Sequence, residues 1–114
     1  SDVAGELKPG ITWKEIFSAL LPAGSISGAP KSSALEVISE NEPFERGPYC
    51  GILGWVQGDQ AELSVAIRTF WSLRDSKLHF GTGAGITWGS DPVAEWEETQ
   101  LKARHLISIA GGEL

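Results

Sequence analysis

The apolar residues near the start of the chain are spaced as on one face of a helix. From Trp13 to Leu21 they recur three or four positions apart, and Pro22 ends the run. Thr12 stands three residues before Glu15, which is the spacing of a capping box that satisfies free backbone amides at a helix start. These signals predict a short amphipathic helix after Thr12.

The boundaries of two further helices can be read from proline and glycine. After a glycine- and serine-rich loop over 23–29, Pro30 suits the first position of a second helix, which we predict over 31–41. A final helix is predicted from about 91 to 110, and the two glycines at 111–112 end it.

Between these helices the apolar pattern changes to a period of two residues. Strands are predicted over 49–56, 61–71 and 78–80, with turns at 57–60 and 74–77. The predicted order is therefore helix, helix, strand, strand, strand, helix. This order is typical of the α+β class, with an antiparallel sheet and flanking helices.

Composition restricts what such a domain binds. The 114 residues include 15 acidic and 9 basic side chains, a net charge of −6, so nothing resembles the clustered cations of a nucleic-acid or anionic-membrane surface. No apolar run approaches the roughly 18 to 20 residues of a membrane span. The single cysteine, Cys50, cannot form an internal disulfide. We therefore expect a cytoplasmic protein with no nucleic-acid or membrane partner.

Two carboxylates on the final predicted helix could carry chemistry. At 100° per residue, Glu98 and Lys102 lie within about 60° of Glu95, beside an apolar stripe. The stripe consists of Trp96, Ala103, Ile107 and Ala110. Glu95 and Glu98 could hold a hard divalent cation such as Mg²⁺, with Lys102 binding a second anionic group. The alternative is a surface pair between Glu98 and Lys102, which are four residues apart.

Arg68 presents a similar choice. On the strand predicted over 61–71 it shares a face with small or polar side chains, so its guanidinium could bind a carboxylate bidentately or form a salt bridge at the rim. The glycine-rich segment 24–32 lacks the spacing of a P-loop, and 81–85 is not followed directly by a helix that could hold a pyrophosphate. Segment 81–85 could still bring backbone amides close to a ligand carboxylate, or mark a tight crossing of strands.

Several segments form a recognisable set in a fixed order along the chain. They are AGSISGAPK (23–31), EP (42–43), RGPYCG (46–51), AIRT (66–69), GAGI (83–86), SDP (90–92), EWEET (95–99) and KAR (102–104). Together they resemble the C-terminal part of the chorismate-utilising enzymes and cover nearly the whole chain. The likeness is greatest to the para-aminobenzoate branch of that family, the aminodeoxychorismate synthases that serve folate synthesis. The anthranilate branch is the alternative, because the motifs are largely shared.

The resemblance implies two groups of site residues. The family's Mg²⁺ ligands match Glu95 and Glu98. Lys31 belongs to the family signature, but the resemblance gives it no chemical role. The positions that match substrate-contacting residues or the wall of the substrate pocket are Tyr49, Arg68, Gly83, Gly85, Lys102 and Ser27.

The resemblance also implies a reaction and its partners. The substrate would be chorismate, and Mg²⁺ would neutralise its ring carboxylate and so assist departure of the 4-hydroxyl group. A glutamine amidotransferase subunit or domain would supply ammonia. The implied fold is a four-layer α/β/β/α arrangement, of which this chain would form one part.

Some of the family's active-site segments have no counterpart in this sequence. These include a lysine-containing motif of the para-aminobenzoate branch, a further metal-binding glutamate and a histidine-containing segment. We therefore expect residues 1–114 to be the C-terminal part of a chorismate-binding domain with little or no catalysis by itself. Such a part of a larger domain would expose apolar surface that is otherwise buried, and this surface would favour self-association. A non-catalytic ligand-binding module is the other hypothesis.

Overall fold

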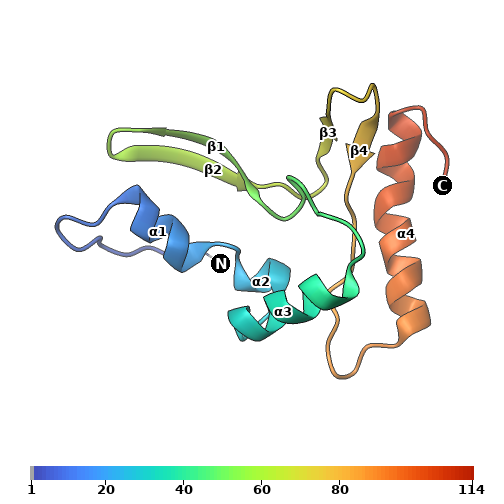
Figure 1. The fold of residues 1–114 in the computed structure, drawn as a ribbon, viewed down its shortest axis with the longest axis horizontal. Coiled ribbons are helices and arrows are strands. Elements are labelled where there is room, and N and C mark those ends of the chain that lie inside the picture. Colours follow the sequence, from blue (N-terminus) through green and yellow to red (C-terminus); the bar gives the residue numbers. More distant parts are fainter. Residues whose placement is uncertain (1) are drawn as a thin grey trace.

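The computed structural model describes residues 2–114 and shows four helices and two β-hairpins within that range (Figure 1). The helices are α1 (Trp13–Leu20), α2 (Gly24–Ser27), α3 (Lys31–Asn41) and α4 (Pro92–Ile109). The strands are β1 (Ile52–Gln57), β2 (Gln60–Val65), β3 (Phe70–Ser72) and β4 (Leu78–Phe80). No helix in this part of the chain is long and apolar enough to cross a membrane.

The predicted helix starts are confirmed. The Thr12 hydroxyl accepts a hydrogen bond from the Glu15 amide, and the Glu15 carboxylate accepts one from the Thr12 amide at 2.8 Å. The Thr12 hydroxyl also donates to the Glu15 carboxylate at 2.7 Å. This bond first, and the bond from the Thr12 amide second, favour the carboxylate and lower the pKa of Glu15. At the start of α4, the Asp91 side chain accepts from the Ala94 amide at 2.9 Å. Both helices therefore have side-chain caps that satisfy their free amides.

Lys31, which the family resemblance leaves without a chemical role, has a structural one. Its Nζ donates to the carbonyl oxygens of Ala19 at 3.0 Å and Leu21 at 3.1 Å. These carbonyls lie at the C-terminal end of α1, where the last turn has no intrahelical donors. Lys31, the first residue of α3, therefore caps the C-terminal end of α1 and links α1 to α3.

The prediction of one three-stranded antiparallel sheet is wrong. Among residues 2–114, β1 pairs with β2 alone, in register from Ile52 opposite Val65 to Gln57 opposite Gln60, and β3 pairs with β4 alone. The strand predicted over 61–71 is interrupted at 66–69, where Ala66 is buried and Arg68 has a φ of 54°. A left-handed residue ends the two-residue alternation, so the faces assigned to this strand do not continue through the break.

The chain is more open than a typical domain of its length. Its accessible surface is 9403 Å², against ~6,100 Å² expected for a folded monomer of this mass. Its radius of gyration is 16.6 Å, against ~13 Å for a compact domain of this length. Within residues 2–114 the buried hydrophobic side chains are Ala66 and Ala103 alone.

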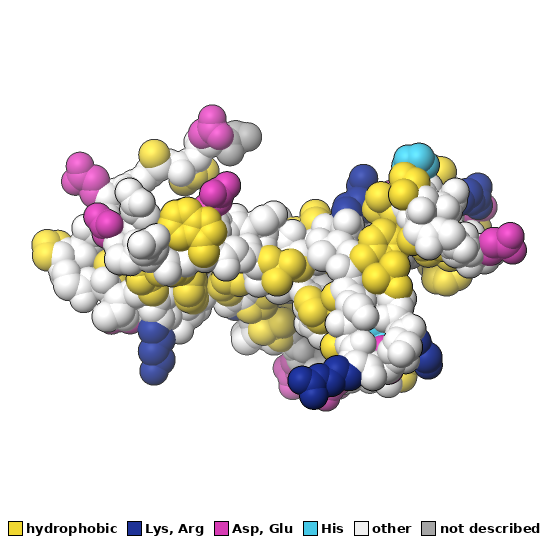
Figure 2. All heavy atoms as spheres, turned by 90° about the horizontal axis from the view of Figure 1, so that it is seen from above, with side chains coloured by type: hydrophobic (Ala, Val, Ile, Leu, Met, Phe, Trp, Pro, Cys, Tyr) yellow, Lys and Arg dark blue, Asp and Glu magenta, His cyan; other side chains and the backbone are white. Residues whose placement is uncertain are grey.

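Apolar side chains accordingly lie on the surface of several elements (Figure 2). The stripe predicted on the final helix is buried at Ala103, but Trp96 is 63% exposed. The four-layer arrangement is not visible in the described residues, which form two separate hairpins with helices beside them (Figure 1). The α+β class is confirmed, whereas the layers implied by the family resemblance remain an expectation.

Candidate functional site

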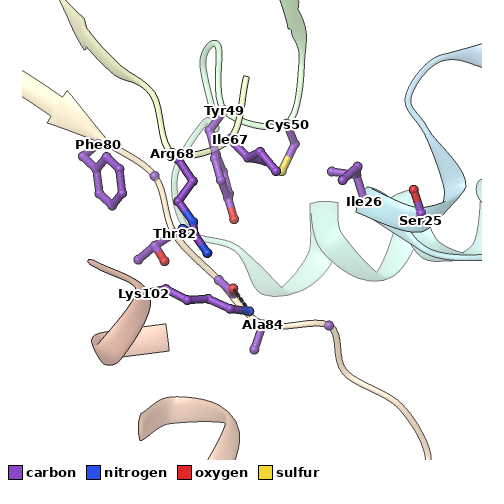
Figure 3. Close-up of a pocket in the computed structure, with 13 residues that line it drawn as sticks. Ser25, Ile26, Tyr49, Cys50, Ile67, Arg68, Phe80, Thr82, Ala84 and Lys102 are labelled. Carbon is purple, nitrogen blue, oxygen red and sulfur yellow. Dashed lines mark hydrogen bonds between the residues drawn. The ribbon is translucent and has the colours of Figure 1, made fainter. Parts of the chain in front are cut away.

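A cleft of about 280 Å³ lies where five distant segments of the chain meet (Figure 3). The segments are α2, the residues before β1, the break after β2, the glycine-rich segment after β4, and the middle of α4. The lining residues are Ser25, Ile26, Tyr49, Cys50, Ile67, Arg68, Phe80, Gly81, Thr82, Gly83, Ala84, Gly85 and Lys102. We call this the cleft.

Backbone geometry at the break in the sheet brings Arg68 to the cleft. Cys50 and Arg68 have φ values of 67° and 54°, a region that few residues other than glycine adopt. The Cys50 amide donates to the Ala66 carbonyl at 3.0 Å, and the Ala66 amide donates to the Gly51 carbonyl at 2.9 Å. These bonds join the two left-handed positions, and the Arg68 side chain extends toward the glycine-rich segment (Figure 3).

Tyr49 stands against that glycine-rich segment. A Cβ atom added at Gly81 would overlap the Tyr49 ring, and one at Gly83 would lie 3.1 Å from the Tyr49 hydroxyl. Glycine at these positions therefore allows the close approach of backbone and phenol. Burial, and secondly the neighbouring Cys50 thiol, raise the pKa of Tyr49 to about 12. The phenol is therefore neutral near pH 7 and can donate a hydrogen bond to an anion in the cleft.

Lys102 reaches the cleft from α4. Its Nζ pairs with a Glu98 carboxylate oxygen at 2.5 Å and makes a long contact of 3.4 Å with the Gly83 carbonyl. The Thr82 hydroxyl donates to the Thr99 carbonyl at 3.4 Å, a second contact between the glycine-rich segment and α4. A partly exposed ammonium group therefore lies at the edge of the cleft, together with Arg68.

The two predicted metal ligands lie beside the cleft and do not line it. Glu95 accepts a hydrogen bond from the Ser90 hydroxyl at 2.6 Å, and Glu98 forms the pair with Lys102 that the sequence offered as the alternative. Within residues 2–114 no group of three or more His, Cys, Asp or Glu side chains surrounds a common point. Two carboxylates one helical turn apart still suit Mg²⁺, which commonly takes one or two carboxylates together with water and substrate oxygens.

Five of the six predicted substrate-contacting or pocket-wall positions line the cleft. They are Tyr49, Arg68, Gly83, Gly85 and Lys102. The structure places Ser27 outside it, with its hydroxyl donating to the Ala23 carbonyl at 3.0 Å. Ser25 and Ile26 occupy the position expected of Ser27, because residues 24–27 form a helical turn instead of the predicted loop. The sequence also gave no reason to select Thr82 or Phe80.

Comparison with known proteins defines the class of this chain. Residues 1–108 match the family model described as "chorismate binding enzyme". The chain therefore belongs to the chorismate binding enzyme family.

Three similar proteins are longer than this chain and share one name. Anthranilate synthase component 1 of Neisseria meningitidis is 46% identical over 111 residues, which are 96% of this chain and 22% of that protein. The protein of the same name from Acinetobacter calcoaceticus is 43% identical over 108 residues, 94% of this chain and 22% of the relative. The Lactococcus lactis relative is 42% identical over 110 residues, 96% of this chain and 24% of the relative. The chain thus spans roughly a quarter or less of the length of these relatives.

Proposed function

We propose that the chain forms part of a chorismate-binding domain and that the cleft holds chorismate. The observation that carries this proposal is the meeting of Arg68, Lys102 and Tyr49 in one cleft of a chain that belongs to the chorismate binding enzyme family. Two cations and a neutral phenol donor suit a small substrate with two carboxylates. The glycine-rich segment 81–85 would let the substrate pack against backbone.

Each charged group has a distinct task in this proposal. Arg68 offers a planar fork that can hold one carboxylate by two hydrogen bonds. Lys102 is a compact charge that must leave Glu98 in order to bind a second anionic group. Tyr49 is a donor near pH 7, because its pKa of about 12 lies far above neutral.

Glu95 and Glu98 would hold Mg²⁺ through two carboxylates. When bound, the cation would supply Lewis-acid stabilisation of negative charge on the substrate's ring carboxylate. The Ser90 hydroxyl supports this role by orienting Glu95 from the residue before the helix cap. Because Glu98 is paired with Lys102, binding of the metal would release the Lys102 ammonium toward the cleft.

The relatives favour the anthranilate branch over the para-aminobenzoate branch. Those described above are named anthranilate synthase component 1, so we propose that the substrate is directed to anthranilate. The sequence motifs had favoured the other branch, but the two branches largely share these motifs. The words "component 1" in the name of this relative fit the presence of a second component. We propose that the second component is a glutamine amidotransferase that supplies ammonia.

A chimera tests the proposed site. In it, this chain replaces the 111-residue segment that it matches in the Neisseria meningitidis relative. Chorismate affinity is measured by calorimetry for the chimera and for its Arg68→Met and Arg74→Met variants. Loss of a charge-assisted contact predicts about 30-fold weaker binding for Arg68→Met. Arg74 is exposed in the β3–β4 turn, so Arg74→Met is the matched control and should bind normally. Equal affinities for the two variants would remove Arg68 from the site.

A further inference from the structure

An ion pair outside the cleft lies directly behind Tyr49. Arg46 Nε donates to Glu42 Oε2 at 2.7 Å, and the terminal guanidinium nitrogen donates to Oε1 at 2.5 Å. About a quarter of each side chain is exposed. The fork geometry fixes the guanidinium plane as well as its position, which a single charge contact does not do.

The same guanidinium lies over the Tyr49 ring. The Arg46 Cζ atom is 5.7 Å from the ring centroid, which is within the range of a cation–π contact. The ring also meets the backbone at Gly81, where an added Cβ would overlap it, and its hydroxyl lies close to Gly83. The phenol therefore lies against both the Arg46 guanidinium and the backbone at Gly81 and Gly83, where no side chain can move to make room for the ring.

We propose that Arg46, held by Glu42, is a positioning residue that keeps the Tyr49 hydroxyl directed into the cleft. Glu42 follows α3, so this helix sets the place of the ion pair and, through it, the place of a substrate-binding group. The benefit to chorismate binding rests on the proposed function. The placement of the ring does not.

Several charged or titratable groups surround the phenol and could compete for this role. Cys50 is adjacent in sequence and raises the pKa of Tyr49, and Cys50, Arg68 and Lys102 line the same cleft. These three approach from the cleft side, where a bound substrate would meet them. Arg46 is the cation that lies over the face of the ring, so its removal should move the ring without removing a cleft cation.

The composition of the chain makes a direct test possible, because Tyr49 is its single tyrosine. We would label the full chain with ¹³C-tyrosine and ¹³C-glycine and record nuclear Overhauser contacts between the Tyr49 ring and the Gly81 Hα protons. The wild-type chain and Arg74→Met should show this contact. Arg46→Met should lose at least half of its intensity, and Arg46→Lys should lose part of it because lysine lacks the fork.

The exchanged pair E42R/R46E separates positioning from simple stabilisation. It restores an ion pair between positions 42 and 46 but places the cation on the wrong residue to cover Tyr49. We expect its urea unfolding midpoint to return to the wild-type value while the ring contact stays weak. Recovery of the ring contact, or an undiminished contact in Arg46→Met, would overturn the proposal. If Arg46→Met does not fold, Arg46→Lys and the exchanged pair give the same decision.

Chorismate binding provides the functional readout in the chimera described above. Loss of one partly shielded cation–π contact predicts about fivefold weaker chorismate affinity for both Arg46→Met and the exchanged pair. Unchanged affinity in both variants would show that Arg46 does not position Tyr49 for the substrate. If the wild-type chimera binds no chorismate at all, the proposed function fails, and the ring contact still decides whether Arg46 positions Tyr49.

Discussion

The glycine-rich segment after β4 allows a graded test of how the cleft is built. Gly81, Gly83 and Gly85 alternate along one segment, and none of them has a left-handed φ. Alanine is therefore compatible with the backbone at all three positions. The three substitutions differ in the atoms that the new Cβ would meet. At Gly81 the Cβ would overlap the Tyr49 ring and lie 2.8 Å from the Tyr49 Cβ atom. At Gly83 it would lie 3.1 Å from the phenol oxygen, and at Gly85 it would meet nothing within 4 Å.

These different contacts of the added Cβ predict three different changes in the free energy of unfolding. Overpacking at Gly81→Ala should destabilise the chain by about 1–3 kcal/mol, because the ring must move. Gly83→Ala should cost less than about 1 kcal/mol, since a hydroxyl group can shift by a few tenths of an ångström. Gly85→Ala should be neutral or stabilising by about 0.4–1 kcal/mol, because alanine restricts the unfolded chain.

Urea unfolding followed by tryptophan fluorescence measures all three variants, since the chain has five tryptophans. The denaturant dependence of the unfolding free energy should be the same for each variant, so that the midpoints report stability. The reasoning is refuted if Gly85→Ala costs as much as Gly81→Ala. It is also refuted if Gly81→Ala causes no loss, because the Tyr49 ring would then not rest on this segment.

Four further predictions concern other parts of the molecule. Lys31→Met should destabilise the chain by about 1 kcal/mol through loss of two hydrogen bonds, whereas Lys14→Met at an exposed position of α1 should not; equal urea midpoints would contradict this. Arg46 lowers the pKa of Glu42 in the folded chain, so this carboxylate adds stability above its ordinary pKa and loses it as pH falls through the lowered value; Glu42→Gln should flatten the acid part of a stability–pH curve. In the chimera, Glu98→Gln should weaken Mg²⁺ affinity about tenfold or more, and an unchanged affinity would leave Glu98 as a surface partner of Lys102. The surface in excess of a compact monomer, ~3,300 Å², predicts self-association in sedimentation experiments, and a single monomeric species at high concentration would count against it.

Helices α1, α3 and α4 could be predicted because their signals are local. A capping box at Thr12, a proline at position 30 and an aspartate–proline pair before α4 each act within one turn of chain. The break in the predicted strand over 61–71 could not be read in the same way. No glycine or proline marks the break at 66–69, and the left-handed φ of Arg68 occurs beside backbone bonds that join Ala66 to the distant residues 50–51.

The candidate site could be predicted residue by residue but not as a surface. Family motifs selected Tyr49, Arg68 and Lys102, and the structure brings these three to one cleft. Ser27 does not line the cleft, because the short helix α2 was not expected and its turn directs Ser25 and Ile26 there, so a role for Ser27 stays a prediction. The ion pair between Glu42 and Arg46 was not predicted either.

The central claim is that this chain supplies part of a chorismate site in an anthranilate-forming enzyme. The most direct measurement is turnover of chorismate by the chimera with ammonia and Mg²⁺, with the unmodified Neisseria meningitidis relative assayed beside it. Our account predicts that the chimera forms anthranilate and that Arg68→Met strongly reduces the rate. A folded chimera that forms no product, or that accumulates 4-amino-4-deoxychorismate in place of anthranilate, would contradict it.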